Sequence, residues 1–350
     1  MKKLLLTSAL VGSLVSGLSV ANAATTVSGN LGISYVATSN ETSGGGAATE
    51  KSHNGFGAEN QINMGATGDL NNGMKYAAGF SWEFDGSETF VSGNAFEGTY
   101  IEFISGGTTF GISADRAPNI DGIGANYVGY GYSKIDGVGS SIVTTSNTEV
   151  YGNFGFNVRQ DLGGGNVISA FYVPNSNQSN TTTIFVGRDI HNGTTKAVID
   201  GGESAYNLNY TGKIAGADIK AGLVTTNGAA TYSDATAQGL AISYPFGKTK
   251  VGFSYAKTES SVQTGTVATE LTTWQYGIAQ AVSDTVSVGL TYVDADTNTA
   301  ARTNEKVFIA ALGYNLGPVS VQLQYKDAQD IGGVTGTDAT SLGMYVGTKF

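Results

Sequence analysis

Cysteine is absent from the 350 residues, so disulfide bonds cannot contribute to the stability of the fold. Charged residues make up only 13% of the chain, about half of the roughly 25% that is usual in globular proteins. The two histidines, His53 and His191, lie in neither an H-E-x-x-H nor a G-x-S-x-G setting. We therefore expect no catalytic site, no bound metal and no cofactor.

A membrane-spanning helix is also missing from most of the chain, because no run of about 20 apolar residues follows Val20. The first residues have the pattern of an export signal instead. Lys2 and Lys3 precede an apolar stretch that ends in an Ala-Asn-Ala cleavage pattern. We expect residues 1–23 to be a signal peptide cleaved between Ala23 and Ala24. The alternative is a membrane anchor, but the stretch is short and contains several Ser and Gly.

Glycine is abundant, with 51 residues, and so are aromatic residues, with 18 Tyr and 15 Phe. Apolar residues also alternate with polar or small ones, most clearly over residues 62–84. A period of two predicts β-strands, and the Asn72-Gly73 pair between two such runs predicts a tight hairpin. One face of this hairpin is apolar and the other polar, which suits a wall between lipid and water.

Strand-like segments continue along residues 24–350, which we interpret as one domain. Besides the two arms of the hairpin, they are predicted at residues 27–35, 96–104, 108–114, 149–159, 167–173, 204–213, 217–225, 237–244, 249–257, 271–281, 285–293, 306–315, 319–326 and 340–350. Short connections alternate with long ones, including loops over residues 36–56 and 174–203. A β-solenoid is the alternative, but its coils would repeat with a uniform short period.

The pattern predicts an all-β fold, a 16-stranded antiparallel transmembrane β-barrel with short periplasmic turns and long extracellular loops. The first and last strands then meet and close the barrel, which leaves no open edge in lipid. Aromatic residues near strand ends, such as Tyr35, Tyr255, Trp274 and Tyr314, fit two interfacial girdles. The alternative explanation is that strands favour aromatic residues in any case.

This layout resembles the general trimeric porins of Gram-negative bacteria. The hairpin from Gly65 to Lys75 is similar to the family's G-x-x-x-D-L-G-N-G-x-K turn, a second hairpin precedes a long third loop, and the chain ends in Phe350. The resemblance implies a homotrimer and a third loop, residues 115–148, that folds into the pore. It also implies that Phe350 helps the barrel assembly machinery to recognise the last strand.

The parity of the strands and the resemblance together give candidate residues for a pore constriction. Three of them, Lys75, Glu102 and Arg159, have the parity that points away from lipid. The third loop adds Asp115, Arg116, Asp121, Lys134 and Asp136. This loop lacks the Pro-Glu-Phe-Gly-Gly-like run of the family. The family's pores also carry a cluster of arginines on the wall that faces this loop. Because this chain has only four arginines, such a cluster must contain few arginines or be built with lysine. Alternatively, each candidate is a solvated lumen residue without influence on selectivity.

The expected function is passive diffusion of small hydrophilic solutes and ions through an outer-membrane pore surrounded by lipid, without enzyme activity. Without Lys2 and Lys3, the chain has 16 basic and 28 acidic residues, a formal charge of −12. This charge disfavours nucleic acid as a partner and favours a preference for cations. Two alternatives remain, an adhesin-like barrel with a closed lumen and a substrate-specific channel.

Overall fold

The computed structural model describes residues 24–42, 49–87, 95–113, 155–173, 184–185, 198–199, 204–226, 235–260, 269–297 and 303–350. The predicted signal peptide and the predicted third loop lie outside these residues, and so do the loop candidates Asp115, Arg116, Asp121, Lys134 and Asp136. Among the described residues, no helix is long and apolar enough to cross a membrane.

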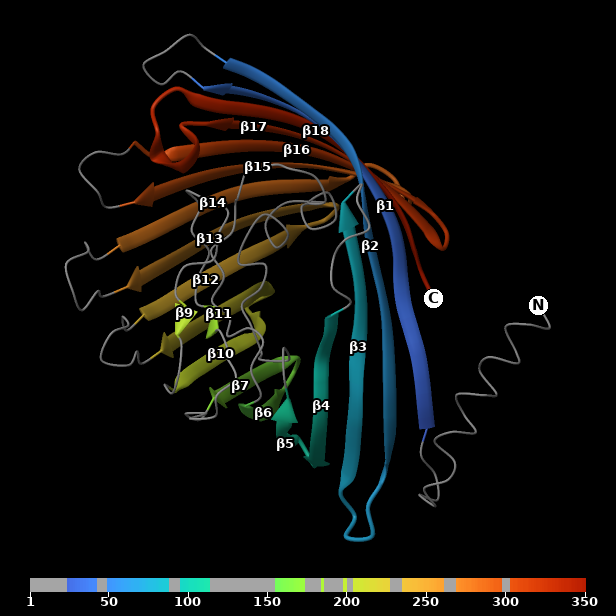
Figure 1. Cartoon of the computed structure of the whole chain (residues 1–350). Helices are drawn as coiled ribbons and strands as arrows, with labels where there is room; N and C mark the ends of the chain where they lie inside the picture. Colours follow the sequence, from blue (N-terminus) through green and yellow to red (C-terminus); the bar gives the residue numbers. More distant parts are fainter. Residues whose placement is uncertain are drawn as a thin grey trace.

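A closed barrel of 16 antiparallel strands dominates the structure, and consecutive barrel strands lie side by side around the ring (Figure 1). The strands are β1 (Ala24–Thr42), β2 (Thr49–Asp69), β3 (Lys75–Ser87), β4 (Ala95–Ser105), β5 (Thr108–Ser113), β6 (Gly155–Gly163), β7 (Asn166–Val173), β10 (Ala205–Ile214), β11 (Ala217–Thr226), β12 (Ala235–Phe246), β13 (Thr249–Ser260), β14 (Thr269–Ala281), β15 (Val286–Thr297), β16 (Glu305–Leu316), β17 (Val319–Gln329) and β18 (Thr337–Lys349). This confirms the predicted 16-stranded antiparallel barrel. Two short strands, β8 (Ile184–Phe185) and β9 (Val198–Ile199), form a separate sheet.

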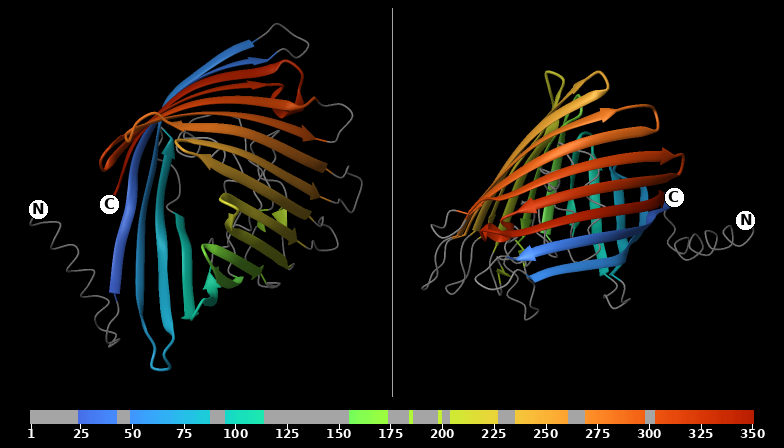
Figure 2. Two further views of the ribbon diagram at one scale, coloured as in Figure 1. Left: turned by 180° about the vertical axis from the view of Figure 1, so that it is seen from behind. Right: turned by 90° about the horizontal axis from the view of Figure 1, so that it is seen from above.

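Short connections join the strands at one end of the barrel, which we call the turn end; the opposite end is the loop end (Figure 2). Two of the short turns repeat one pattern, in which a Tyr is followed three residues later by Gly247 or Gly317. Both glycines have a left-handed backbone, with φ of +59 and +73. A side chain would strain this conformation, which explains why glycine occupies the same place in both hairpins.

The seam between β1 and β18 closes the barrel. Gly29 and Phe350 exchange two backbone hydrogen bonds of 3.0 Å, so the pairing extends to the last residue. Farther along the seam, the ring of Tyr345 on β18 lies where a Cβ atom on Gly32 or Gly347 would be. Gly32 and Gly347 are direct partners in the register, so Tyr345 covers a small gap on the inner face of the two strands.

Several strands extend farther toward the loop end than the sequence periodicity predicts. The predicted loop 36–56 is largely strand, because the pairing of β1 with β2 continues up to Thr42 and Thr49. Likewise β15 continues to Thr297 and does not end at residue 293. The backbone ladder needs no alternation of side chains, and beyond the lipid both faces of a strand can be polar. The period of two is therefore lost before the strand ends.

The connection from β17 to β18 folds inward at the loop end. It contains a short 3₁₀ turn, η1 (Ile331–Gly333). Ile331 belongs to a buried apolar cluster with residues that face the lumen from β15 to β18, namely Val293, Val307, Ile309, Ala328 and Ala339. The sequence did not indicate this cluster, which covers the lumen side of these four strands.

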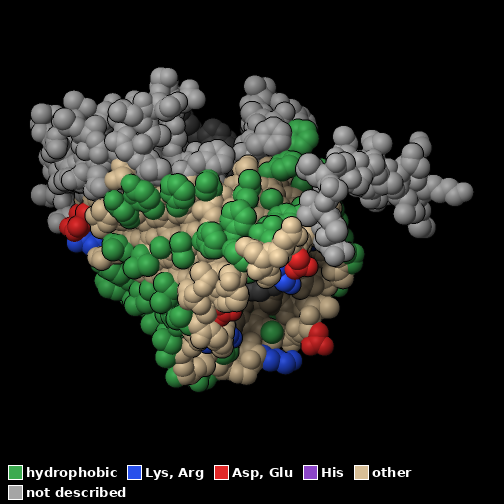
Figure 3. All heavy atoms as spheres, turned by 90° about the horizontal axis from the view of Figure 1, so that it is seen from below, with side chains coloured by type: hydrophobic (Ala, Val, Ile, Leu, Met, Phe, Trp, Pro, Cys, Tyr) green, Lys and Arg blue, Asp and Glu red, His purple; other side chains and the backbone are tan. Residues whose placement is uncertain are grey.

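The outer face of the barrel is apolar. Large hydrophobic side chains of one parity are exposed around the ring, including Ile33, Ile101, Ile112, Phe156, Leu208, Leu223, Ile278, Leu290, Leu312 and Leu342. Figure 3 shows one side of the wall, where hydrophobic side chains are widespread and charged ones are few. Toward the loop end, aromatic rings pack in pairs, such as Tyr255 with Trp274 at a centroid distance of 4.5 Å. This arrangement matches a hydrocarbon band bordered by interfacial aromatic residues.

Candidate pore lining

The inner face of the barrel has the opposite character. On β10, the outward Leu208 is 53% exposed, whereas the neighbouring Asn209 points inward and is 5% exposed. The same alternation places small or polar side chains inward on the other strands, among them Ser34, Thr38, Ser113, Ser169, Asn207, Thr273, Gln275, Thr291, Gln324 and Ser341. A closed ring with a polar inner face and an apolar outer face separates water inside from lipid outside.

Glu102 faces the lumen, as its parity predicts. Its carboxylate accepts a 2.8 Å hydrogen bond from the side-chain amide of Asn157, and Glu102 is only 8% exposed. The two residues belong to β4 and β6, and the residue between them in the register, on β5, is Gly111. Since Gly111 has no side chain, the hydrogen bond spans the intervening strand directly.

Residues that are paired across neighbouring strands form a row around the wall. Lys75 and Arg159 belong to the row that follows that of Glu102 toward the turn end. In this row Lys75 pairs with Ile104, Ile104 with Thr109, and Thr109 with Arg159. The guanidinium of Arg159 donates a 3.4 Å hydrogen bond to the Thr109 hydroxyl, and the Lys75 ammonium lies 4.0 Å from the Asp69 carboxylate. The three strand candidates therefore share two adjacent rows of β3 to β6. Their role in a constriction stays a prediction.

A second charged group on the inner wall was missed as a site. The ammonium of Lys213 lies 3.1 Å from the carboxylate of Asp218, and that of Lys250 lies 4.0 Å from the other oxygen of this carboxylate. Lys220, two residues beyond Asp218 on β11, has the same inward parity. The parity of Lys220 and Lys250 was evident from the sequence, but their grouping with Lys213 across β10 to β13 depends on the register.

One group of acidic side chains has the outward parity at the loop end, whereas Glu305 at the start of β16 is buried on the inward parity. The ammonium of Lys257 lies 2.5 Å from a carboxylate oxygen of Glu259 and 3.2 Å from one of Glu270. On β15, the carboxylate of Asp294 accepts a 2.8 Å hydrogen bond from the Asn304 side chain. These carboxylates therefore face away from the lumen. Within the ranges that the structure describes, no group of three or more His, Asp or Glu side chains could hold a metal ion.

The closed ring, its apolar outer band and its polar lumen define a transmembrane β-barrel pore of the outer-membrane class. The sequence supports the same class independently, because the family model for Gram-negative porins matches residues 7–333. The chain belongs to the Gram-negative porin family. No match to a curated protein was found.

Solved structures with a similar fold are porins and related outer-membrane proteins. An anion-selective porin from Comamonas acidovorans superposes with a TM-score of 0.66 at 15% identity, covering 94% of this chain and 100% of that chain. In-vitro folded OmpT of Vibrio cholerae, in its trimer form, superposes with a TM-score of 0.60 at 12% identity, covering 94% and 100%. At these identities the likeness shows the fold alone.

Proposed function

We propose that this protein is a passive, water-filled pore for small hydrophilic solutes and ions in the outer membrane of a Gram-negative bacterium. The observation that carries the proposal is the polar inner face inside a closed ring whose outer face is apolar. Solutes move down their gradients without any reaction chemistry. Residues 1–23 serve as the export signal, and Phe350 serves as the signal for the barrel assembly machinery.

The test is single-channel recording of the refolded, mature protein in a planar lipid bilayer with potassium chloride. We expect stable, large conductance steps, and a trimer would give steps in groups of three. A correctly folded barrel that gives no steps would overturn the pore proposal and favour the adhesin-like alternative. Sequencing the N-terminus of the exported protein tests the cleavage site separately, with Ala24 as the expected first residue.

The ion preference is best inferred from the charges that face the lumen, not from the net charge of the chain. The described inner wall of β10 to β13 bears Lys213, Lys220 and Lys250 but only one carboxylate, Asp218. The acidic group around Lys257 faces outward. The comparisons do not support the cation preference expected from the sequence. A weak preference for anions agrees better with this wall.

Reversing the charge of two wall lysines, Lys220→Glu with Lys250→Glu, is expected to shift the permeability ratio toward cations. A unit charge about 10 Å away contributes about 0.4 kcal/mol in water, and screening at 0.1 M salt reduces this to about one third. Four units of charge then give about 0.6 kcal/mol for each ion, favourable for cations and unfavourable for anions. The permeability ratio therefore changes by about 1.2 kcal/mol, or about sevenfold. The reversal potential under a salt gradient measures it. Lys306→Glu, at an exposed outward position, is the control, and an equal shift there would contradict the assignment of the wall.

The homotrimer requires an apolar surface that a second copy can cover. On the outer face, Ile101, Phe103, Phe110, Ile112 and Phe156 line a hydrophobic groove of about 630 Å³ across β4 to β6. The similar OmpT of Vibrio cholerae has a trimer form. We therefore assign this groove to the contact between copies in the trimer. The narrowing of each pore by residues 115–148 belongs to the same proposal.

A further inference from the structure

We propose that the inner wall of β1 to β4 holds a binding site for neutral polyhydroxylated solutes of about monosaccharide size. This inference rests on the proposed pore function and adds a substrate class to it. The site is a pocket of about 320 Å³, near the lower limit of about 300 Å³ for small-molecule sites. Its hydrogen-bonding side chains are Thr26, Ser28, Gln61, Asn63, Ser81 and Tyr100.

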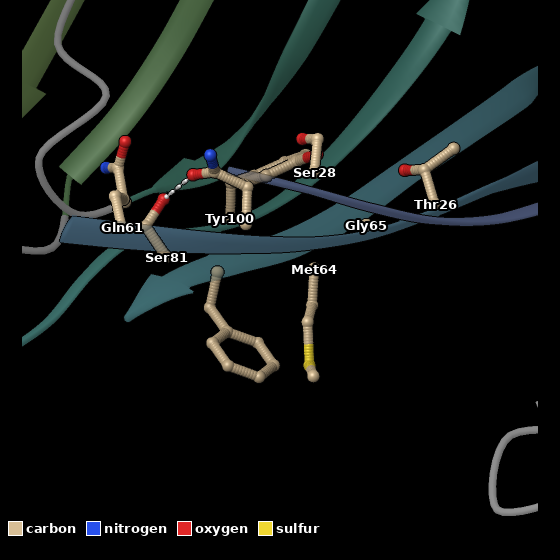
Figure 4. A pocket seen from close by; sticks show the side chains of 10 residues that line it. Thr26, Ser28, Gln61, Met64, Gly65, Ser81 and Tyr100 are labelled. Carbon is tan, nitrogen blue, oxygen red and sulfur yellow. Dashed lines mark hydrogen bonds between the residues drawn. The ribbon is translucent and has the colours of Figure 1, made fainter. Parts of the chain in front are cut away.

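The polar side chains of the pocket come from four neighbouring strands and point to one side. Figure 4 shows Thr26, Ser28, Gln61, Ser81 and Tyr100 on the lumen side of the sheet, while Met64 points to the opposite side. All the residues that line the pocket are uncharged. Hydroxyl and amide groups both donate and accept hydrogen bonds, which matches the hydroxyl groups of a sugar better than a fixed charge does.

One row of this wall forms an aromatic platform. Thr26, Gly65, Gly79 and Tyr100 are successive partners across β1, β2, β3 and β4. A Cβ atom on Gly79 would lie 2.9 Å from both Cε1 and the hydroxyl oxygen of Tyr100, and one on Gly65 would lie 3.5 Å from the same oxygen. The Tyr100 ring therefore lies along the sheet, over the two glycines. The ring packs against the backbone of the sheet at these two glycines.

The neighbouring row supplies oriented polar groups. Ser28, Asn63 and Ser81 are successive partners across β1, β2 and β3. The Ser81 hydroxyl donates a 2.6 Å hydrogen bond to the side-chain oxygen of Asn63, which directs the amide nitrogen of Asn63 away from Ser81. A sugar whose C–H face stacks on the ring of Tyr100 would then bring its hydroxyl groups to this row.

The opposite part of the wall lacks this combination. On β11 to β13 the inward positions include Val224, Ala237, Ala241 and Ala256, all buried, beside the lysines of the charged group. The wall of β1 to β4 therefore holds an uncharged, hydrogen-bonding pocket, although Glu102 lies two residues from Tyr100 on β4, whereas the wall of β11 to β13 carries the lysines. A neutral solute of suitable size is held in the pocket, whereas the charged side chains elsewhere on the wall act on ions.

The experiment is a titration of glucose into single open channels of the refolded protein in potassium chloride. We expect excess current noise and a saturable fall in current. Ser81→Ala and Asn63→Ala should each raise the half-saturating glucose concentration about fivefold, which is the effect of one lost hydrogen bond. Tyr100→Ala should remove saturation altogether. Ser254→Ala, which removes an inward, buried hydroxyl on β13, is the matched control and should leave the titration unchanged.

The outcomes separate this inference from the pore proposal. A folded protein without conductance in potassium chloride overturns both. Normal conductance with a current that falls only linearly with glucose, as it does with a polyethylene glycol of similar size, overturns the sugar site alone. An equal effect of Ser81→Ala and Ser254→Ala also overturns it. If Tyr100→Ala does not fold, Ser81→Ala and Asn63→Ala still decide the question.

Discussion

Replacing Gly32 with valine is expected to lower the free energy of unfolding by about 3 kcal/mol, the upper part of the range for overpacked contacts. A side chain at this position would overlap the ring of Tyr345. The ring also covers the backbone of Gly347, where a Cβ atom would overlap it in the same way. Since the contact lies on the seam between β1 and β18, the substitution acts on the closure of the whole barrel. Urea titration in lipid vesicles measures the change.

A double-mutant cycle tests whether the overlap with the ring is the cause. Tyr345→Ala removes the ring and should destabilise the seam on its own, because it leaves the gap over Gly32 empty. In the Tyr345→Ala background, however, Gly32→Val should cost little, since the valine then occupies the gap. The explanation is wrong if Gly32→Val is as harmful without the ring as with it.

Ile112→Arg is expected to convert the proposed trimer into monomers that still form barrels. The side chain of Ile112 is 49% exposed in the single chain and lies in the hydrophobic groove of β4 to β6. A charge on the apolar outer face costs roughly 2–4 kcal/mol near the bilayer midplane, and each copy would bring an arginine into the proposed contact. Light scattering of the protein in detergent, coupled to size-exclusion chromatography, measures the mass of the assembly.

Ile278→Arg provides the matched control for this substitution. Ile278 lies on β14, far from the groove in the order of the strands, and it is 44% exposed on the same outer face. We expect a similar loss of barrel stability but an intact trimer. Dissociation by both variants would show a general effect of the buried charge, and dissociation by neither would place the contact elsewhere on the barrel.

Much of the barrel was predictable because lipid enforces the alternation of side chains. A polar residue at the position of Ile278 or Leu290 would be penalised, so the parity of each strand is visible in the sequence. The same parity correctly placed Glu102, Asn157 and Lys220 on the inner face. The Asn72-Gly73 turn and the closing strand were also evident, since both depend on local patterns.

Features that depend on register or on contacts between distant strands were not predictable. The platform of Tyr100 requires Gly79 and Gly65 to be its neighbours, yet the register of β3 and β4 shifts between Gly79 and Ser81, and the sequence does not indicate this bulge. The grouping of Lys213 with Lys250 around Asp218 has the same origin. The role of residues 115–148 stays a prediction, because these residues lie outside the described structure.

The hydrogen bonds between Gly29 and Phe350 have a consequence for the order of folding events. The first strand needs a partner that lies more than 300 residues away in sequence, so the contact order of the seam is close to the largest that the chain allows. Until β18 arrives, β1 presents an unpaired edge that could pair with any other extended chain. On its way to the outer membrane the chain therefore has an unpaired strand edge that favours aggregation. Its biogenesis depends on keeping the time before β1 and β18 pair short.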